Sequence, residues 1–232
     1  MSLALAARFA RREMRGGLRG FRLFLACLAL GVAAIAAVGS VRAAIEAGLA
    51  REGASLLGGA AELDFTYRFA TDVERAWMQT RADAVSEIVE FRSMAVVGDD
   101  RALTQIKAID DLYPLVGQVE LVPAMSLETA LSVQDGVPGA VMERALSDRL
   151  GLVPGDRFQL GNKTFRFSAA LTREPDSAAS GFALGPRTLL KRAALEGSGL
   201  LSPGTLFNSK YRLALSPDAD LAALQAQAEA AF

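Results

Sequence analysis

The sequence predicts an α+β protein in which one N-terminal transmembrane helix precedes a folded domain outside the cytoplasm. Three observations support this fold class. Residues 23–41 contain no charge, residues 61–97 follow a strand-helix-strand pattern, and that pattern begins again near residue 211. The chain has 232 residues, of which 51% are hydrophobic, so it is long enough to bury a core.

The uncharged run reads LFLACLALGVAAIAAVGSV. As a helix it would measure roughly 28 Å, which is close to the ~30 Å of a bilayer core. A buried soluble helix that is apolar on every side would need a larger core than this chain offers. A cleaved signal peptide is the other alternative, but its apolar region is usually only about 7–15 residues long. Its cleavage site would have to fall in GSVRAA (39–44), which contains an arginine. We therefore expect a span at residues 21–42.

Arginines orient this span. Residues 1–20 read as a cytoplasmic, basic amphipathic leader in which Leu3, Leu5, Phe9 and Met14 alternate with Arg8, Arg11, Arg12 and Arg15. The plainer alternative is a leader that only sets topology. Because positive segments stay in the cytoplasm, we expect residues 43–232 to form a periplasmic core domain of a protein in the plasma (inner) membrane.

Small side chains repeat along one side of the predicted span, at spacings of three and four: Ala26, Ala29, Ala33, Ala36 and Ser40. Such a seam lets helix backbones approach closely in lipid, which predicts packing on other membrane helices. The alternative is that alanine is simply abundant in this chain.

The periplasmic part opens with a strand over 61–69, which places Leu63, Phe65, Tyr67 and Phe69 on one face. Thr71 and Glu74 form a capping box for a helix over 72–82 that carries Val73, Trp77 and Met78. A strand over 85–97 follows. A strand over 211–216 and a helix from Pro217-Asp218 to Phe232 repeat the pattern. Together these elements predict a split βαβ layer, like the ferredoxin fold, truncated before its last strand.

A β-rich insertion at about 98–208 interrupts this layer. Residues 101–110 read as a strand that pairs back through a turn at 98–100, and AVMERALSDRLGL (140–152) reads as a helix. RFQL (157–160) and TFRFSAAL (164–171) form a hairpin around residues 161–163. Residues 174–187 read as a long loop, for which function and plain disorder are both open.

The chemistry-bearing residues point to no reaction. The chain has no histidine, and its one cysteine, Cys27, lies in the apolar run. Of the 25 basic and 26 acidic residues, seven Arg and Glu13 precede residue 43, which leaves the rest with a net charge of −7 and argues against a nucleic-acid partner. Asp99/Asp100 and Asp110/Asp111 read as turn residues. GDRFQLGNKT (155–164) lacks the spacing of a phosphate loop. We expect no catalytic, cofactor-binding or metal-binding residue, no bound cofactor and no enzyme activity.

Three stretches carry a resemblance to a known family: ARFARREMRGGLRGFRLFLACLALGVAAIAAVGS, AMSLETALSVQDGVPGAVMERALSDRLGLVPGDRFQLGNKTFRF and FALGPRTLL. They resemble the FtsX-like or MacB-like permease subunits of ABC transporters, and within these the large YbbP type. The likeness covers essentially the whole chain and rests on order and patterning. It implies further transmembrane helices after the core domain and a separate cytoplasmic ATPase subunit that binds ATP. It also implies ATP-driven movement of the periplasmic domain, with export or extraction of lipophilic cargo in some members.

A second interpretation is a single-span, signal-anchored extracytoplasmic binding or sensor module that acts alone. A permease would continue past residue 232 into three or more apolar runs, so the downstream reading frame separates the two.

Overall fold

The computed structural model describes residues 18–176, 185–201, 204–216 and 218–232. The chain forms two compact units, and the boundary between them lies between Arg51 and Glu52. The predicted leader falls largely on residues 1–17, which lie outside the described residues.

The first unit contains most of helix α2 (Leu18–Leu57). Its segment Arg22–Ile45 is long and apolar enough to cross a membrane by length and composition, and its side chains are exposed. Ser40, in the small-residue seam, donates a hydrogen bond from Oγ to the carbonyl oxygen of Ala36 at 2.8 Å. The helix stops before Gly58, whose φ of 70° is a backbone conformation that glycine adopts without strain.

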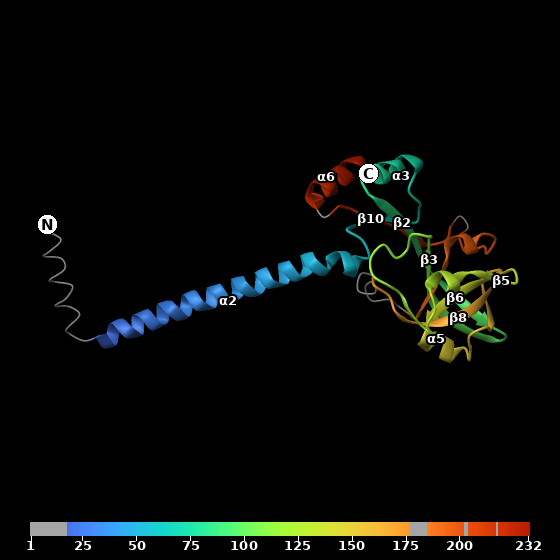
Figure 1. Cartoon of the computed structure of the whole chain (residues 1–232), viewed down its shortest axis with the longest axis horizontal. Coiled ribbons are helices and arrows are strands. Elements are labelled where there is room, and N and C mark those ends of the chain that lie inside the picture. Colours follow the sequence, from blue (N-terminus) through green and yellow to red (C-terminus); the bar gives the residue numbers. More distant parts are fainter. Residues whose placement is uncertain (1–17, 177–184, 202–203, 217) are drawn as a thin grey trace. The chain divides into compact units, whose positions relative to one another are not determined.

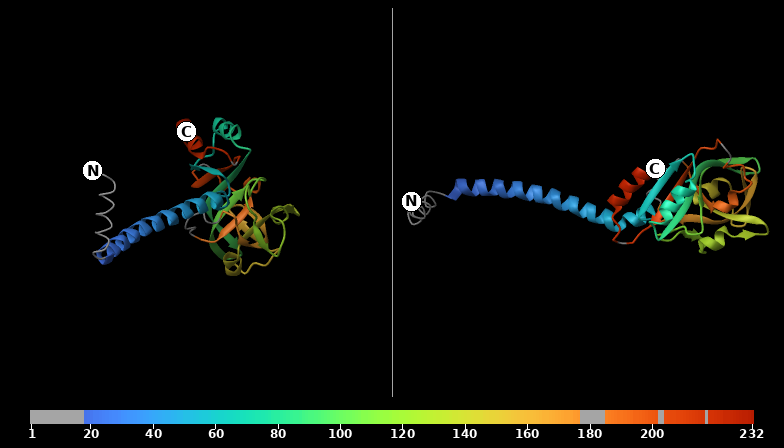
Figure 2. Two further views of the ribbon diagram at one scale, coloured as in Figure 1. Left: turned by 60° about the vertical axis from the view of Figure 1, so that its left-hand side comes forward. Right: turned by 90° about the horizontal axis from the view of Figure 1, so that it is seen from above.

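The second unit begins with the predicted split layer. Strand β10 (Phe207–Ala214) lies between β1 (Ala61–Thr66) and β2 (Ala84–Val97) and is antiparallel to both. Helix α3 (Asp72–Gln79) connects β1 to β2, and α6 (Leu221–Ala231) follows β10. The two helices lie side by side over one face of the layer (Figures 1 and 2). This confirms the split βαβ arrangement.

Aromatic side chains fill the space between these helices and the layer. Phe65, Met78 and Tyr211 are buried together, and the Trp77 ring lies 5.1 Å from the Phe232 ring. The Thr71–Glu74 capping box forms as predicted.

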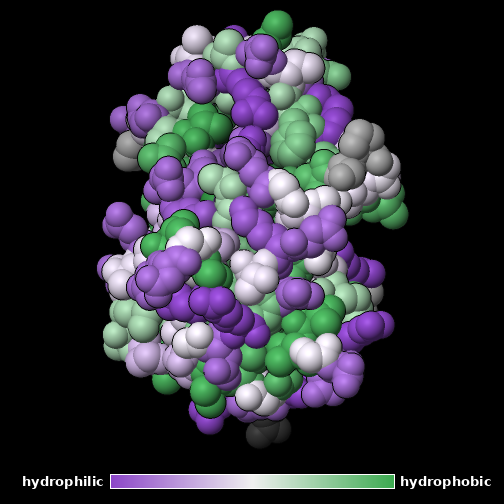
Figure 3. Space-filling view, turned by 90° about the vertical axis from the view of Figure 1, so that its right-hand side faces the viewer, coloured by the Kyte–Doolittle hydropathy of each residue, from purple (hydrophilic) through white to green (hydrophobic). Residues whose placement is uncertain are grey.

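Figure 3 shows another face of the chain, on which hydrophilic residues lie among smaller hydrophobic areas.

Strand β1 pairs only with β10 among the described residues, so its other edge is open. The Tyr67 nitrogen donates to the Phe207 oxygen at 2.8 Å. Because hydrogen-bonded pairs alternate along an antiparallel ladder, Leu63 and Phe65 direct their backbone groups to β10, and Glu62 and Asp64 direct theirs to the open edge.

We expect the Leu63 and Phe65 amides to exchange with deuterium roughly tenfold or more slowly than those of Glu62 and Asp64. Residue-resolved hydrogen exchange by NMR measures this difference. Equal protection at all four amides would contradict an open edge.

The insertion closes into a barrel. Strand β2 continues past the layer and pairs with β3 (Asp100–Ile109) through the predicted turn at Gly98. From β3 the ring of paired strands runs through β9 (Arg187–Lys191), β6 (Val137–Glu143), β8 (Lys163–Arg173) and β7 (Arg157–Leu160), and β7 returns to β2. The insertion also contains five short elements that are not part of this ring: β4 (Glu120–Val122), α4 (Leu127–Leu131), β5 (Val133–Gln134), α5 (Arg144–Arg149) and the 3₁₀ helix η1 (Arg192–Leu195).

The barrel encloses the largest apolar cluster of the described residues, which includes Phe158, Phe165, Phe167, Met142 and Leu190. The Phe158 and Phe165 rings lie 6.0 Å apart across the predicted hairpin. The insertion is therefore β-rich, as predicted, and has a core of its own.

The prediction of a helix over 140–152 is wrong. Residues 140–142 belong to strand β6, and only Arg144–Arg149 is helical. Strand β6 lies between β8 and β9 with nearly every side chain buried, so it is apolar without the alternation of a half-exposed strand. A continuous apolar run of this kind does not distinguish a buried strand from a helix.

Two other predictions need correction. The strand predicted over 61–69 ends at Thr66. The next residue, Tyr67, has a φ of 61°, and its side chain is 58% exposed. The last helix begins after Asp220, whose side chain accepts a hydrogen bond from the Ala223 amide, and not at Asp218. Pro217, the other residue of the predicted start, lies outside the described residues.

Candidate functional site: a buried charge network

The layer face opposite α3 and α6 carries charged side chains on neighbouring strands. Glu62 lies on β1, Lys210 and Arg212 lie on β10, and Glu90 lies on β2. The Lys210 Nζ is 3.1 Å from Glu90 Oε2 and 3.7 Å from Glu62 Oε1. Acidic and basic strands therefore alternate across this face, and the cross-strand pairs attract each other.

Asp176 lies at the centre of the network and is fully buried. One of its oxygens accepts from Lys107 Nζ at 2.6 Å and from the Arg212 guanidinium. The other oxygen accepts from the Tyr113 hydroxyl at 2.8 Å. Since Lys107 is on barrel strand β3 and Arg212 is on layer strand β10, Asp176 joins the two parts of the second unit.

Glu174 extends the network further into the barrel. Its carboxylate accepts from Lys107 Nζ at 2.6 Å and from Arg187 NH1, on β9, at 2.8 Å. The Arg212 Nε donates to Glu62 at 2.9 Å. Three cations (Lys107, Arg187, Arg212) thus meet three carboxylates (Glu62, Glu174, Asp176), and all of these groups except Glu62 are buried. Buried charges are tolerated when they are paired in this way.

The ionisation of the network follows from these contacts. Burial alone would raise the pKa of Asp176, but Lys107 and Arg212 outweigh it and hold that pKa below its ordinary value. Burial, together with the charges of Asp176 and Glu174, raises the pKa of the Tyr113 hydroxyl, which stays protonated and donates. Burial lowers the pKa of Arg212, but Asp176 and Glu62 outweigh it, so that pKa is raised.

The turn that follows α2 contacts this network directly. A Cβ atom on Gly58 would lie 2.7 Å from Arg212 NH1 and 3.0 Å from Asp176 Cβ. A Cβ atom on Gly59 would lie 3.2 Å from Arg212 Cβ. Only glycine fits Gly58, because its φ of 70° is strained for other residues and the space is occupied. The two glycines bring the backbone after α2 against the charged side chains.

A second polar cluster links the layer to the 3₁₀ helix of the insertion. Glu87 on β2 accepts from Arg75 NH1 at 3.2 Å and from the Tyr211 hydroxyl at 3.1 Å. Its carboxylate also lies 3.5 Å from Arg192 Nε, on η1. This cluster lies on the α3 side of the sheet, so polar contacts connect layer and insertion on both faces.

An ion pair also fixes the start of α3. Arg68 makes two hydrogen bonds of 2.7 Å to Glu74, whose carboxylate also accepts from the Thr71 amide at 2.6 Å. These contacts, with the hydrogen bond from Arg68 first among the causes, lower the pKa of Glu74 from 4.5 to about 2.

Because the folded-state pKa is lowered, the contribution of Glu74 to stability is present above pH 4.5 and is lost as the pH falls towards about 2. The difference in free energy of unfolding between the wild type and Glu74→Gln should therefore be constant above pH 4.5 and shrink below it. Urea titrations over this pH range measure it. A difference that does not change with pH would contradict the ion pair.

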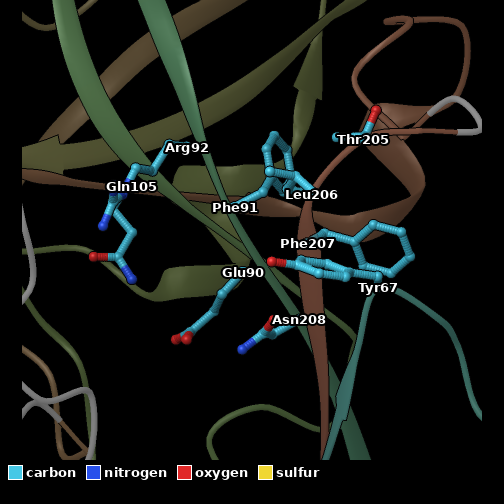
Figure 4. Close-up of a pocket in the computed structure, with 9 residues that line it drawn as sticks. All are labelled: Tyr67, Glu90, Phe91, Arg92, Gln105, Thr205, Leu206, Phe207 and Asn208. Atoms are coloured by element: carbon cyan, nitrogen blue, oxygen red, sulfur yellow. The ribbon is translucent and has the colours of Figure 1, made fainter.

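An open groove of about 530 Å³ lies where β2 passes from the layer into the barrel. Tyr67, Glu90, Phe207 and Asn208 are among its lining residues. Figure 4 shows the side chains of these residues around the groove. The positive φ of Tyr67 holds an aromatic side chain in this groove at a cost in backbone strain.

Of the predicted turn residues, Asp100 is the first residue of β3, whereas Asp110 behaves as a turn residue. Asp110 accepts hydrogen bonds from the amides of Leu112 and Tyr113 and from the Ser86 hydroxyl. GDRFQLGNKT contains the β7–β8 hairpin. Among the described residues no group of three or more His, Cys, Asp and Glu could hold a metal ion. The sequence singled out none of the network residues.

Among known proteins, the chain is similar to the uncharacterized ABC transporter permease YbbP of Escherichia coli (strain K12), with 29% identity over 188 residues. This alignment covers 80% of the chain but 22% of YbbP, so the chain spans about a fifth of the length of the curated relative that it matches. The resemblance predicted from the sequence is confirmed. No family model matches the chain.

Three solved structures are similar in fold. The extracellular domain of YknZ from Gram-positive bacteria has a TM-score of 0.44 at 9% identity, covering 70% of this chain and 78% of that one. The periplasmic region of MacB from Actinobacillus actinomycetemcomitans has a TM-score of 0.45 at 13% identity, covering 73% and 81%. A domain of a permease protein from Porphyromonas gingivalis has a TM-score of 0.43 at 14% identity, covering 65% and 64%.

Proposed function

We propose that the chain is part of the membrane subunit of an ABC-type transporter and transmits ATP-driven conformational change to a periplasmic domain. The observation that carries this proposal is the similarity to the permease YbbP, which is 29% identical to this chain over 188 residues, or 80% of its length. The apolar segment Arg22–Ile45 provides the membrane helix that a permease needs. ATP is bound by a separate cytoplasmic subunit, and lipophilic molecules are the cargo.

The proposed orientation places the N-terminus in the cytoplasm and the second unit in the periplasm. The arginine-rich start of the chain supports it, because positively charged segments are retained in the cytoplasm. In this arrangement α2 is anchored in the inner membrane and packs there on further helices of the whole permease. A fourth strand of the split layer, supplied from outside residues 1–232, would pair with the open edge of β1.

The test is purification of the whole permease in mild detergent under conditions that keep other transporters intact. An ATPase subunit should co-purify and should hydrolyse ATP in the complex. Repeated recovery of the permease alone, while a reference ABC transporter stays assembled in the same detergent, would contradict the proposal.

The small-residue seam provides a mutational test. Ala33→Leu should leave membrane insertion unchanged and should weaken assembly of α2 with other helices, because a larger side chain prevents close approach of the backbones. Recovery of assembled permease after detergent extraction measures this effect. Ile35→Leu, on the other side of the helix, is the control. Unchanged assembly in Ala33→Leu would contradict the seam.

The Tyr67 groove is the observation that favours the second interpretation, a single-span binding or sensor module. Such a module would not need an ATPase or further membrane helices. Sequencing the gene past residue 232 separates the two, because only a permease continues into several apolar runs.

A further inference from the structure

We propose that Gly58, Arg212, Asp176 and Lys107 form the junction through which a displacement at the end of α2 reaches the barrel. The inference rests on the proposed function in one respect, since transmission across the second unit matters for a transporter. The junction itself is a property of residues 58–212 and can be tested without an ATPase or a cargo.

The first step is the contact between backbone and guanidinium. Gly58 immediately follows α2, and there is no room for a Cβ atom between it and Arg212 NH1. A Cβ atom on Gly59 would also come within 3.2 Å of Arg212 Cβ. The Arg212 side chain is 1% exposed, so it has no free space into which it could move away. A shift of this turn must therefore move Arg212 or break its contacts.

The second step is the ion pair between Arg212 and Asp176. Arg212 is held on one side by Glu62 at 2.9 Å and on the other by the Asp176 carboxylate. Both partners of the second pair are buried, so they interact more strongly than a surface pair and water does not screen them. Movement of Arg212 is thereby passed to Asp176.

The third step leads into the barrel. Lys107 Nζ lies 2.6 Å from Asp176 and 2.6 Å from Glu174, and Glu174 binds Arg187 at 2.8 Å. Lys107 and Arg187 belong to β3 and β9, which pair in parallel within the closed ring. The same charged contacts therefore hold both of these neighbouring strands. The charged contacts thus run from the turn after α2 to two adjacent barrel strands.

The test is hydrogen–deuterium exchange of the whole chain in nanodiscs. Gly58→Ala places a methyl group against Arg212 and Asp176, whereas Gly98→Ala has the same kind of positive φ, 56°, but no atom within 4 Å of its Cβ. We expect Gly58→Ala to speed exchange in β9 (Arg187–Lys191) about tenfold. Gly98→Ala should act on the β2–β3 turn and leave β9 unchanged.

If the effect of Gly58→Ala on β9 depends on Asp176, the effect is transmitted through the charge network and is not a general loss of structure. In an Asp176→Asn background, Gly58→Ala should have no further effect on β9, although it should still loosen the turn at Gly58 and Gly59. If Asp176→Asn does not fold, Arg212→Lys replaces it. Arg212 reaches Glu62 through Nε and Asp176 through NH1, and lysine has only one nitrogen in place of these two.

Three results would overturn the proposal. Exchange changes confined to the neighbourhood of Gly58 would show that the turn does not act on the barrel. An equal effect of Gly98→Ala on β9 would show general destabilisation. An undiminished effect of Gly58→Ala in the Asp176→Asn or Arg212→Lys background would show another route. None of these results depends on whether an ATPase co-purifies, so this proposal and the proposed function fail separately.

Discussion

Asp176→Asn is expected to lower the free energy of unfolding of the second unit by about 3 kcal/mol, because breaking a buried ion pair leaves the partner charges uncompensated. Asp176 accepts hydrogen bonds from Lys107, Tyr113 and Arg212, all of which are buried. A neutral amide keeps the shape of the side chain but removes the charge. Urea denaturation followed by circular dichroism measures the loss.

The matched control is Asp148→Asn. Asp148 pairs with Arg144 at 3.6 Å, but both side chains are largely exposed, so the pair is expected to contribute less than about 0.5 kcal/mol. Equal effects of the two substitutions would contradict the idea that the network is a buried electrostatic unit.

A double substitution tests whether Lys107 and Asp176 stabilise the protein through their contact with each other. Lys107→Met added to Asp176→Asn should cost less than the sum of the two single changes, because the contact between the two residues can be lost only once. Additive effects would indicate that Lys107 and Asp176 act independently.

The sequence predicted the split layer well because each of its strands has one apolar and one polar face. In β10, Tyr211 and Leu213 pack under the helices while Lys210 and Arg212 point to the other side, which produces an alternation that can be recognised in a single sequence. The Thr71–Glu74 capping box was also predictable, because it depends only on residues three positions apart.

The barrel was predicted less well because β6, one of its strands, is covered on both faces. Strand β6 has no polar side to reveal its period, and its neighbours β8 and β9 are distant in sequence. Pairing of this kind depends on the whole ring. The sequence could indicate that the insertion is rich in strands, but not that they close.

The charge network was missed for a different reason. Its buried residues, among them Lys107 and Arg212, occupy polar positions of their strands, where solvent exposure is the usual expectation. Their burial depends on residues 174–176, which fall within the predicted long loop of 174–187. The available signal was the matching order of charges, acidic on β1 and basic on β10, which only becomes meaningful once the strands are known to be neighbours.

Gly139→Ala is expected to lower the free energy of unfolding by about 3 kcal/mol through overpacking. Gly139 lies on β6, where a Cβ atom would overlap the backbone oxygen of Ala130 and lie 2.9 Å from Ser168 Oγ. The obstacle on one side is backbone, which cannot rotate away as a flexible side chain can. The methyl group must therefore displace helix α4 from the barrel or distort the pairing of β6 with β8.

Gly136→Ala separates this packing effect from backbone strain. Gly136 has a φ of 76°, and its Cβ would meet no atom within 4 Å, so the expected cost is only the ~1 kcal/mol of a left-handed alanine. Thermal unfolding of both variants in the same detergent measures the difference. If Gly136→Ala cost as much as Gly139→Ala, the loss of stability at both positions would come from backbone conformation and not from packing. Because φ is not positive at Gly139, a larger loss there cannot come from backbone strain. It would show that α4 packs directly on β6, with the carbonyl oxygen of Ala130 against Gly139.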